Sequence, residues 1–376
     1  MGGLKIIGTN ALTYPEIRNF AGHAYTNFRF KKVFDFYKFP AYFLFKLKGL
    51  INRKWLNSYM DLGLNKVSFY HFFNVINLGN KPTIITFETS LPRWNDTTND
   101  FKNGLEIIAK KNCVQLIALS QSAYDRQAMV CKKYRPDLLH KIMAKNRVIL
   151  PPQINFINHI NEKREPGKFI IFTIVGADFF RKGGQAILNA FEELITQNQP
   201  IHLNIVSTLN YGDYASKTNI EDFELAVKLI QKYPNHISHF KSLSNESVKT
   251  LLLDTDVALL PSIAETFGYF ILEAQAAGCP VITTDIRAMP EINSIETGWL
   301  IPIRKANSDE AEIDNPTALI SKISIHLCQI INEILAEPSI VREKGAKALN
   351  NIIKNHSPMH HQALLESIYT SILQNE

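Results

Sequence analysis

Short apolar runs alternate with helix-like segments along the first part of the chain. Runs rich in β-branched and aromatic residues lie at residues 66–69, 83–87, 115–119 and 147–150, and polar or helical sequence follows each one. Strands that alternate with helices are typical of a parallel sheet, because a helix has to carry the chain back between parallel strands.

The same alternation begins again after a polar stretch. An apolar run at residues 169–175 turns at Gly176 and leads into a segment with helical apolar spacing. Further strands are expected at residues 201–206, 237–240, 257–260, 281–283 and 299–301. The sequence therefore predicts a second α/β unit.

Length and linker composition set the expected domain boundaries. The chain has 376 residues, and two prolines followed by a polar stretch at residues 162–167 have the composition of a hinge. We therefore expect an N-terminal Rossmann-like domain over residues 1–152 and a C-terminal one over residues 153–357. The tail, residues 358–376, is expected to form one more helix.

Composition excludes several classes of protein. Hydrophobic residues make up 45% of the chain and charged residues 20%, which is ordinary for a globular protein and unlike a disordered one. The 4 cysteines are far apart and form no C-x-x-C pair. This spacing argues against a disulfide framework, a structural zinc site or a redox dithiol, and favours a reducing cytosol.

The net charge of +6 is concentrated in residues 28–54, where basic residues greatly outnumber acidic ones and aromatic residues are interleaved with them. Such a segment suits an anionic membrane surface, which is the partner we expect here. Single-stranded nucleic acid is a competing partner, and a pair of basic helices with inward-facing rings is the structural alternative. No uninterrupted apolar run of about 18 residues and no secretory signal is evident, so contact with a membrane is expected only at its surface.

The richest candidate chemistry lies at residues 261–280, directly after an expected strand. A helix is expected at residues 268–277, with Glu265 just before it and Glu273 within it. Eight steps of helical rise separate these carboxylates by about 12 Å, roughly the span from the sugar to the ribose of a nucleotide sugar. The backbone N–H groups of Thr266, Phe267 and Gly268 are expected to offer an anion site between them.

Each glutamate also has an ordinary structural explanation. Glu265 can be an acid favoured by the helix dipole, and Glu273 can be a surface residue of an amphipathic helix. The neighbours of Glu273 are almost all apolar, however, and a carboxylate buried among them needs a hydrogen-bonding partner.

A second strand–loop–helix segment carries two cations. Arg181 and Lys182 precede Gly183 and Gly184, at the expected start of a helix. Because the helix dipole disfavours positive charge there, a bound anion would explain the pair better than a solvated basic loop does.

Together these segments resemble the retaining glycosyltransferases of family 4, which have the GT-B fold of two Rossmann-like domains facing each other across a cleft. The resemblance rests on Arg181-Lys182-Gly183-Gly184 and on the Glu265–Glu273 pair that follows Pro261-Ser262. It extends through the segments 280–284, 290–292 and 298–300, and covers residues 169–300.

The resemblance implies a retaining, metal-independent hexosyltransferase that uses a UDP- or GDP-linked sugar and needs no cofactor. Arg181 and Lys182 would bind the diphosphate, Glu265 the sugar hydroxyls and Glu273 the ribose. Ser207 and Leu243 fall where the family lines its nucleotide pocket. The acceptor would be a glycan or lipid-linked molecule of cell-surface polysaccharide or lipopolysaccharide biosynthesis, at the cytoplasmic face of the membrane. The tail helix would pack back on the N-terminal domain.

The chain departs from the family pattern at three places. Ala177 occupies the position where many members have an arginine, no glycine-rich loop follows the first strand, and His71 is only a possible substitute for an N-terminal histidine. Asp254-Thr255-Asp256 has the D-x-D spacing of metal-dependent transferases but precedes a strand, which favours a capping role.

Three other functions remain open. One is a nucleotide-sugar epimerase or phosphorylase of the same architecture. Another is an inactive member that binds a membrane or another transferase. The third is nucleic-acid binding through residues 28–54, with the steep salt dependence that phosphate contacts impose.

Overall fold

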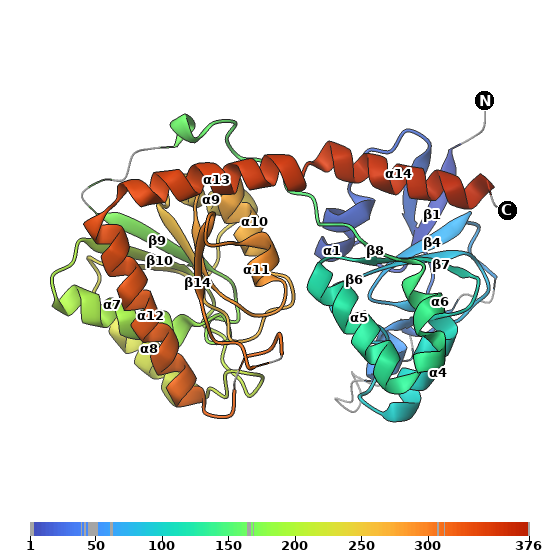
Figure 1. The fold of residues 1–376 in the computed structure, drawn as a ribbon, viewed down its shortest axis with the longest axis horizontal. Coiled ribbons are helices and arrows are strands. Elements are labelled where there is room, and N and C mark those ends of the chain that lie inside the picture. Colours follow the sequence, from blue (N-terminus) through green and yellow to red (C-terminus); the bar gives the residue numbers. More distant parts are fainter. Residues whose placement is uncertain are drawn as a thin grey trace. The chain divides into compact units, whose positions relative to one another are not determined.

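The computed structural model describes residues 4–38, 40, 43, 52–60, 63–163, 167, 169–306, 308–311 and 313–374. The chain divides into two compact units (Figure 1). The first unit contains Met1–Pro152 together with Ser357–Glu376, and the second contains Gln153–His356.

The first unit is built on a six-stranded sheet with the order β2-β1-β4-β6-β7-β8 and parallel pairing throughout. Its strands are β1 (Lys5–Thr9), β2 (Phe28–Lys32), β4 (Phe69–Phe73), β6 (Thr83–Phe87), β7 (Cys113–Ala118) and β8 (Asn146–Val148). A small second sheet pairs β3 (Ser58–Tyr59) with β5 (Ile76–Asn77). Its helical segments are α1 (Tyr14–Glu16), the π-helical turn η1 (Ile17–Ala21), α3 (Arg53–Leu56), α4 (Thr98–Ile108), α5 (Gln121–Tyr134), η2 (Pro136–Leu138), α6 (Leu139–Met143) and α14 (Pro358–Gln374).

The second unit has a six-stranded parallel sheet with the order β11-β10-β9-β12-β13-β14. Its strands are β9 (Ile170–Val175), β10 (Ile201–Val206), β11 (Ile237–Phe240), β12 (Val257–Leu260), β13 (Val281–Thr284) and β14 (Gly298–Ile301). Its helical segments are η3 (Ile160–Glu162), α7 (Gly184–Thr196), α8 (Ile220–Lys232), α9 (Asn245–Asp254), α10 (Tyr269–Ala276), α11 (Met289–Ile292), α12 (Pro316–Ala336) and α13 (Ser339–Asn355). When the strands are numbered along the chain, their order across the sheet is 3-2-1-4-5-6, the Rossmann arrangement. The chain adds successive strands on one side of β9 and then on the other, so the strand order reverses between β9 and β12.

The helices of the second unit follow the apolar spacing of the sequence. On α7 the apolar side chains recur every three or four residues, and all of them are buried: Ile187, Leu188, Phe191, Leu194 and Ile195. The strands are apolar on both faces because helices cover a parallel sheet on both sides.

The last helix, red in Figure 1, belongs to the first unit and packs on its sheet. The Tyr369 side chain is fully buried against the rings of Phe28 and Phe69, with centroid distances of 5.4 and 5.6 Å. Its hydroxyl lies 2.9 Å from Nδ1 of His71, whose Nε2 is 2.8 Å from the Thr86 hydroxyl. A buried polar group needs such partners, so this chain of contacts holds α14 in register with β4 and β6.

One strand expectation for the first unit is wrong, and so is part of the helical alternative for residues 28–54. The strand expected at residues 66–69 begins only at Phe69, since residues 66–68 form a loop before β4. Residues 28–32 are an edge strand and not a helix, because Phe28 and Phe30 alternate with exposed Arg29 and Lys31 at the period of a β-strand. The inward-facing rings of that alternative are nevertheless found at Phe28, which is buried. Much of the basic stretch, residues 39, 41–42 and 44–51, lies outside the described residues.

All four cysteines are buried free thiols. The helix α12 is, by length and composition alone, long and apolar enough to cross a membrane, and 33% of that window is buried. A core helix of a soluble protein passes the same test, and α12 packs against α7. It is therefore weak evidence for a membrane span.

Candidate functional site

Two loops meet where the strand order of the second unit reverses. Residues 176–183 connect β9 to α7, residues 261–268 connect β12 to α10, and β9 and β12 are neighbours in the sheet. The two loops are joined through the backbone, since the Ile263 N–H donates to the Arg181 carbonyl at 3.0 Å. Ligands of open α/β sheets bind at this reversal, beyond the carboxyl ends of the strands.

Gly183 makes the approach of the two loops possible. It has a left-handed backbone with φ of 86°, and a Cβ at this position would lie 2.2 Å from the Pro261 carbonyl oxygen. Both the backbone conformation and the close contact therefore require glycine.

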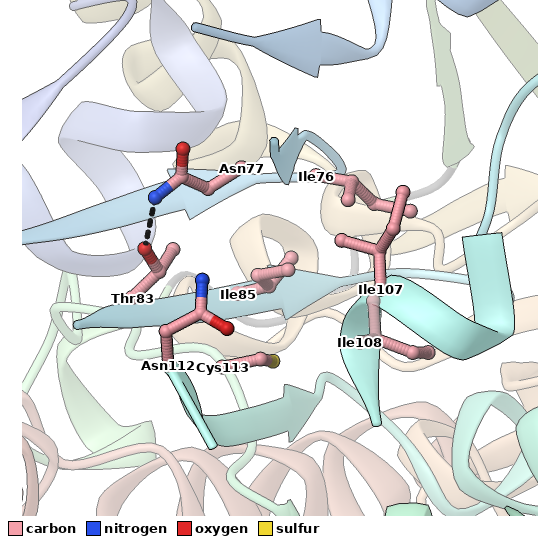
Figure 2. Close-up of a pocket in the computed structure, with 8 residues that line it drawn as sticks. All are labelled: Ile76, Asn77, Thr83, Ile85, Ile107, Ile108, Asn112 and Cys113. Carbon is pink, nitrogen blue, oxygen red and sulfur yellow. Dashed lines mark hydrogen bonds between the residues drawn. The ribbon is translucent and has the colours of Figure 1, made fainter. Parts of the chain in front are cut away.

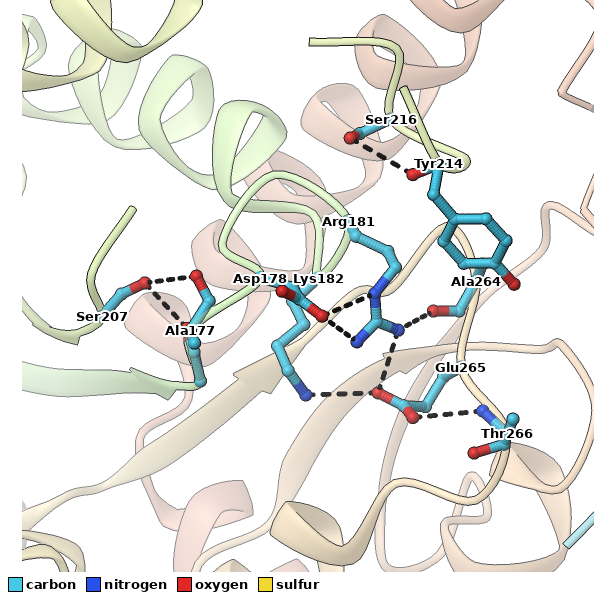
Figure 3. A network of polar contacts seen from close by, with 11 residues as sticks. Ala177, Asp178, Arg181, Lys182, Ser207, Tyr214, Ser216, Ala264, Glu265 and Thr266 are labelled. Atoms are coloured by element: carbon cyan, nitrogen blue, oxygen red, sulfur yellow. Dashed lines mark hydrogen bonds and ion pairs between the residues drawn. The ribbon is translucent and has the colours of Figure 1, made fainter. Parts of the chain in front are cut away.

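The loops bring Arg181, Lys182 and Glu265 together (Figure 3). Lys182 Nζ lies 3.2 Å from Glu265 Oε2, and Arg181 Nη1 lies 3.8 Å from the same oxygen. The side chains are 15%, 19% and 11% exposed for Lys182, Arg181 and Glu265 respectively. These ion pairs are thus largely removed from water, and the Coulomb interaction is strong in such a setting.

Arg181 is held in place by further contacts of its guanidinium. Nη1 donates to the Ala264 carbonyl at 2.5 Å, and Nη2 donates to Asp178 Oδ2 at 2.8 Å. Asp178 is a site residue that the motif comparison missed, and its spacing three residues before Arg181 is the signal that could have found it. Its carboxylate is 51% exposed, so Arg181 keeps one partner facing solvent.

Gly176 leaves room for the Lys182 side chain. A Cβ on Gly176, whose φ is 144°, would lie 2.4 Å from Lys182 Cε. Lys182 therefore passes across the end of β9 to reach Glu265, which explains why the turn after this strand carries glycine.

The expected anion site in the second loop is arranged differently. The helix begins at Tyr269 with Gly268 as its left-handed N-cap, so Thr266, Phe267 and Gly268 precede the helix and are not its first turn. The Thr266 N–H donates to Glu265 Oε1 at 3.1 Å, and Phe267 is buried. The expectation that these N–H groups are free is therefore wrong for Thr266, which instead orients Glu265.

Glu273 lies on the partly exposed side of α10. It and Tyr269, one turn earlier, are half-buried, and the remaining residues of the helix are buried. The expectation of an almost wholly apolar helix holds, but Glu273 sits at its edge and not in the core. Its position on the same helix that follows Glu265 is compatible with contact to a second part of one ligand.

The two residues assigned to the nucleotide pocket differ in character. Ser207 is 3% exposed, and its hydroxyl donates to the Gly176 carbonyl at 2.7 Å and accepts from the Leu209 N–H at 3.0 Å. It supports the loop after β9 and presents no hydroxyl to solvent. Leu243 lies half-buried in the loop between β11 and α9.

Two other polar motifs have structural explanations. Asp256 is buried, accepts from the Ile171 N–H at 2.8 Å and so joins the loop before β12 to β9. His71 is fully buried in the first unit beneath α14 and stacks on Phe20. Within the described part of the chain, no group of three or more His, Cys, Asp or Glu side chains is placed to hold a metal ion.

The first unit also contains a small pocket between α4 and the strands β5 and β6 (Figure 2). Its walls are mostly apolar, Asn77 donates to the Thr83 hydroxyl at 2.8 Å within it, and it leaves no room for a water molecule. We interpret it as a packing feature and not as a ligand site.

With this geometry established, the relation to known families can be stated. Residues 155–315 match the sequence model of glycosyl transferases group 1. The matched segment contains all three residues of the Arg181, Lys182 and Glu265 cluster.

Curated relatives share part of the chain. An uncharacterised glycosyltransferase of Methanocaldococcus jannaschii is 27% identical over 154 residues, which are 40% of this chain and 36% of that protein. A Salmonella typhimurium protein named as a candidate colanic acid biosynthesis glycosyltransferase is 28% identical over 142 residues, 35% of this chain and 32% of that protein. The chain spans about a third of the length of the curated relatives it matches.

Solved structures extend the likeness to the whole fold. A glycosyltransferase from Rickettsia africae is similar with a TM-score of 0.59 at 16% identity, over 100% of both chains. HepE of Anabaena in complex with UDP is similar with a TM-score of 0.57 at 13% identity, over 80% of this chain and 78% of that one. These likenesses, with two parallel sheets in two Rossmann-like units, show that the chain has the GT-B fold.

Proposed function

We propose that the protein is a glycosyltransferase that moves a sugar from a nucleotide-diphosphate sugar to a glycan or lipid-linked acceptor. The observation that carries this proposal is the convergence of Lys182 and Arg181 on Glu265, at the strand-order reversal of the group 1 segment. The presence of UDP in the HepE structure supports a nucleotide donor.

The two cations suit a diphosphate. A guanidinium can hold two phosphate oxygens in parallel, whereas an ammonium supplies a compact point charge. As the bond between sugar and phosphate breaks, negative charge grows on the departing diphosphate, and cations already in place stabilise that charge without having to reorganise. In this proposal Lys182 and Arg181 provide the stabilisation without a metal ion.

Glu265 has a different part in the same step. Its carboxylate faces the cations, where a diphosphate would bring more negative charge. We propose that the donor phosphates take over both cations and that Glu265 then accepts hydrogen bonds from the sugar hydroxyls. Glu273 would hold the ribose. The acceptor hydroxyl would attack the anomeric carbon on the face from which the diphosphate leaves and pass its proton to the departing phosphate oxygen, so that the configuration is retained.

The acceptor and the location belong to the same proposal. Similarity to a protein named for colanic acid biosynthesis supports a role in cell-surface polysaccharide or lipopolysaccharide assembly. We further propose work at the inner face of the membrane through residues 28–54, in which Phe34, Phe36 and Phe43 are 56%, 50% and 57% exposed. Exposed rings beside cations suit an anionic interface.

The test is the thermal unfolding midpoint with UDP, GDP, ADP or buffer alone, all in excess chelator. A ligand at about 100 times its dissociation constant adds about 2.7 kcal/mol, enough to raise the midpoint by several degrees. We expect one nucleotide to raise it in the native protein and in Lys228→Ala, an exposed lysine of α8, but not in Lys182→Ala. No shift with any nucleotide would contradict the proposal and favour an inactive partner.

Retention is tested separately once the donor is known. Proton NMR of the first product formed, before any mutarotation, shows whether the anomeric configuration of the donor is kept. An inverted product would refute the retaining mechanism while leaving glycosyl transfer intact.

A further inference from the structure

A hollow of about 420 Å³ lies in the first unit, between the edge strand β2 and the connection that leads from β1 through η1. Its walls are mainly aliphatic and aromatic, and are formed by Leu4, Leu12, Ala21, His23, Ala24, Tyr25, Phe28, Arg29 and Phe30. The volume falls in the range of small-molecule sites, which are apolar with a few placed polar groups.

His23, which lines this hollow, has one unsatisfied ring nitrogen behind the wall. The Nε2 atom of His23 is buried and has no hydrogen-bond partner among the described residues. Burial, together with nearby His361, lowers the pKa of His23 to about 4, so the ring is neutral at physiological pH. Because this nitrogen is closed off even from water, the neutral His23 ring is part of the wall, and the charge that a ligand meets has to come from another residue.

Basic side chains outnumber acidic ones around the hollow. Arg29 lines it, and Lys5, Lys31 and Lys32 lie exposed on the same pair of strands. Two acids face this region: Glu16 is buried and accepts from the Thr13 N–H, and Glu366 of α14 accepts from the Thr26 N–H at 3.2 Å. Arg29 is exposed and lines the hollow, so its guanidinium is available to an anion there.

We propose that this hollow binds an amphiphilic anion, with an apolar chain against its aliphatic and aromatic walls and a phosphate or carboxylate at Arg29. Two sources share this chemistry: a lipid-linked acceptor of the proposed transferase, and a phospholipid of the membrane on which it works. The assignment to the acceptor rests on the proposed function, whereas binding of the amphiphile itself does not.

The first experiment measures binding of octyl phosphate to the full chain by calorimetry, below its micellar concentration. Octyl glucoside and inorganic phosphate serve as the neutral chain and the bare anion. We expect octyl phosphate to bind at least about 10-fold more tightly than either one, because only it engages both the walls and the cation. Shortening the chain to hexyl phosphate should weaken binding by about fourfold for each CH₂ removed from the hollow. Equal binding of octyl glucoside would overturn the proposal.

Variants locate the binding. Ala24→Trp places a ring in the hollow from an exposed position, and we expect it to abolish octyl phosphate binding. Arg29→Gln should weaken binding by about 10-fold or more. Its matched control is Arg147→Gln, on the exposed edge strand β8 at the other side of the same sheet, which should have no effect. Unchanged binding in Ala24→Trp would refute the site.

Further measurements test whether the ligand binds at the hollow, whether that binding is independent of the nucleotide site, and where the ligand comes from. The NMR signal of His23 should shift with octyl phosphate, and that of exposed His140 should not. Lys182→Ala should still bind octyl phosphate, and the unfolding midpoint of Ala24→Trp should still rise with the nucleotide. Loss of octyl phosphate binding can therefore be distinguished from failure of the proposed function. If Ala24→Trp also lowers binding to phosphatidylglycerol vesicles, the ligand is a membrane lipid. Unchanged vesicle binding identifies a lipid-linked acceptor.

Discussion

The two units share an architecture but use their polar side chains differently. Each has a six-stranded parallel sheet, yet only the second has the 3-2-1-4-5-6 order, with two loops meeting at the reversal. In the first unit the buried polar groups His71, Tyr369 and Thr86 satisfy one another and hold α14. In the second, two cations converge on one carboxylate at a partly open position. The comparison teaches that polar groups satisfied within the core indicate folding, whereas charges gathered at a strand-order reversal indicate chemistry.

The largest expected effect is on catalysis in the second unit. Lys182→Ala removes the cation nearest Glu265, and we expect kcat to fall by about 100- to 1000-fold, as for loss of one preorganised charge-stabilising group. Lys228→Ala should leave kcat unchanged. The measurement is steady-state transfer with the donor that the thermal assay identifies, and a loss below tenfold would contradict the role of Lys182.

Glu265→Gln should separate binding from transfer. The neutral amide no longer competes with phosphate for Lys182 and Arg181, so nucleotide affinity should be kept or should rise. Transfer should fall by about 100-fold, since a carboxylate forms stronger hydrogen bonds to sugar hydroxyls than an amide does. Calorimetry and rate measurements on the same sample test this, and a parallel loss of nucleotide affinity would show that Glu265 only orders the loop.

Gly183→Ala tests the contact between the two loops. The new Cβ meets the Pro261 carbonyl and the backbone is left-handed, so we expect a loss of about 1 to 3 kcal/mol in unfolding free energy. Gly212→Ala, where a Cβ meets nothing within 4 Å, is the control and should cost little. Urea unfolding compares them, and equal midpoints would mean that the loops do not need this close approach.

Acid should destabilise the first unit before the second. Burial lowers the pKa of His23 to about 4, assisted by nearby His361, and burial also lowers the pKa values of His71 and His361. Because these rings have a pKa near 6.5 when unfolded, the unfolded chain binds more protons as the pH drops. The stabilisation is complete above about pH 6.5 and is lost as pH falls towards 4.

Hydrogen exchange of α14 between pH 7.5 and 4.5 measures this effect. The comparison is α7 of the second unit, which should remain protected over the upper part of that range. His23→Phe should flatten the pH response of α14, and an unchanged response would assign the effect to His71 and His361.

The smallest expected effect is that of Tyr369→Phe. It leaves His71 Nδ1 without its hydroxyl partner, at a cost of about 1 kcal/mol or somewhat more. Exchange in α14 should increase while nucleotide binding by the second unit stays unchanged. Tyr211→Phe, at a 48% exposed tyrosine, is the control. Equal exchange in both variants would mean that packing alone holds α14.

The sequence predicted the elements best where apolar runs are bounded by polar residues. The expected ranges of β6, β10, β11 and β12 coincide with the structure. The start of β4 was missed because residues 66–67 resemble a strand locally, and the helix after Glu265 starts one residue late because Gly268 is left-handed. Local pattern identifies the type of an element more reliably than its ends, which depend on turns and caps.

Taken alone, the sequence determined the two α/β units and the loops that carry Arg181, Lys182 and Glu265, because hydrophobic periodicity and loop position are local properties. The tertiary structure decided which of these groups meet. It placed Lys182 nearer than Arg181 to Glu265, turned the Ser207 hydroxyl inward and set Glu273 at the edge of its helix. Such outcomes depend on the space left by Gly176 and Gly183 and on contacts between residues about 80 positions apart, which no local pattern contains.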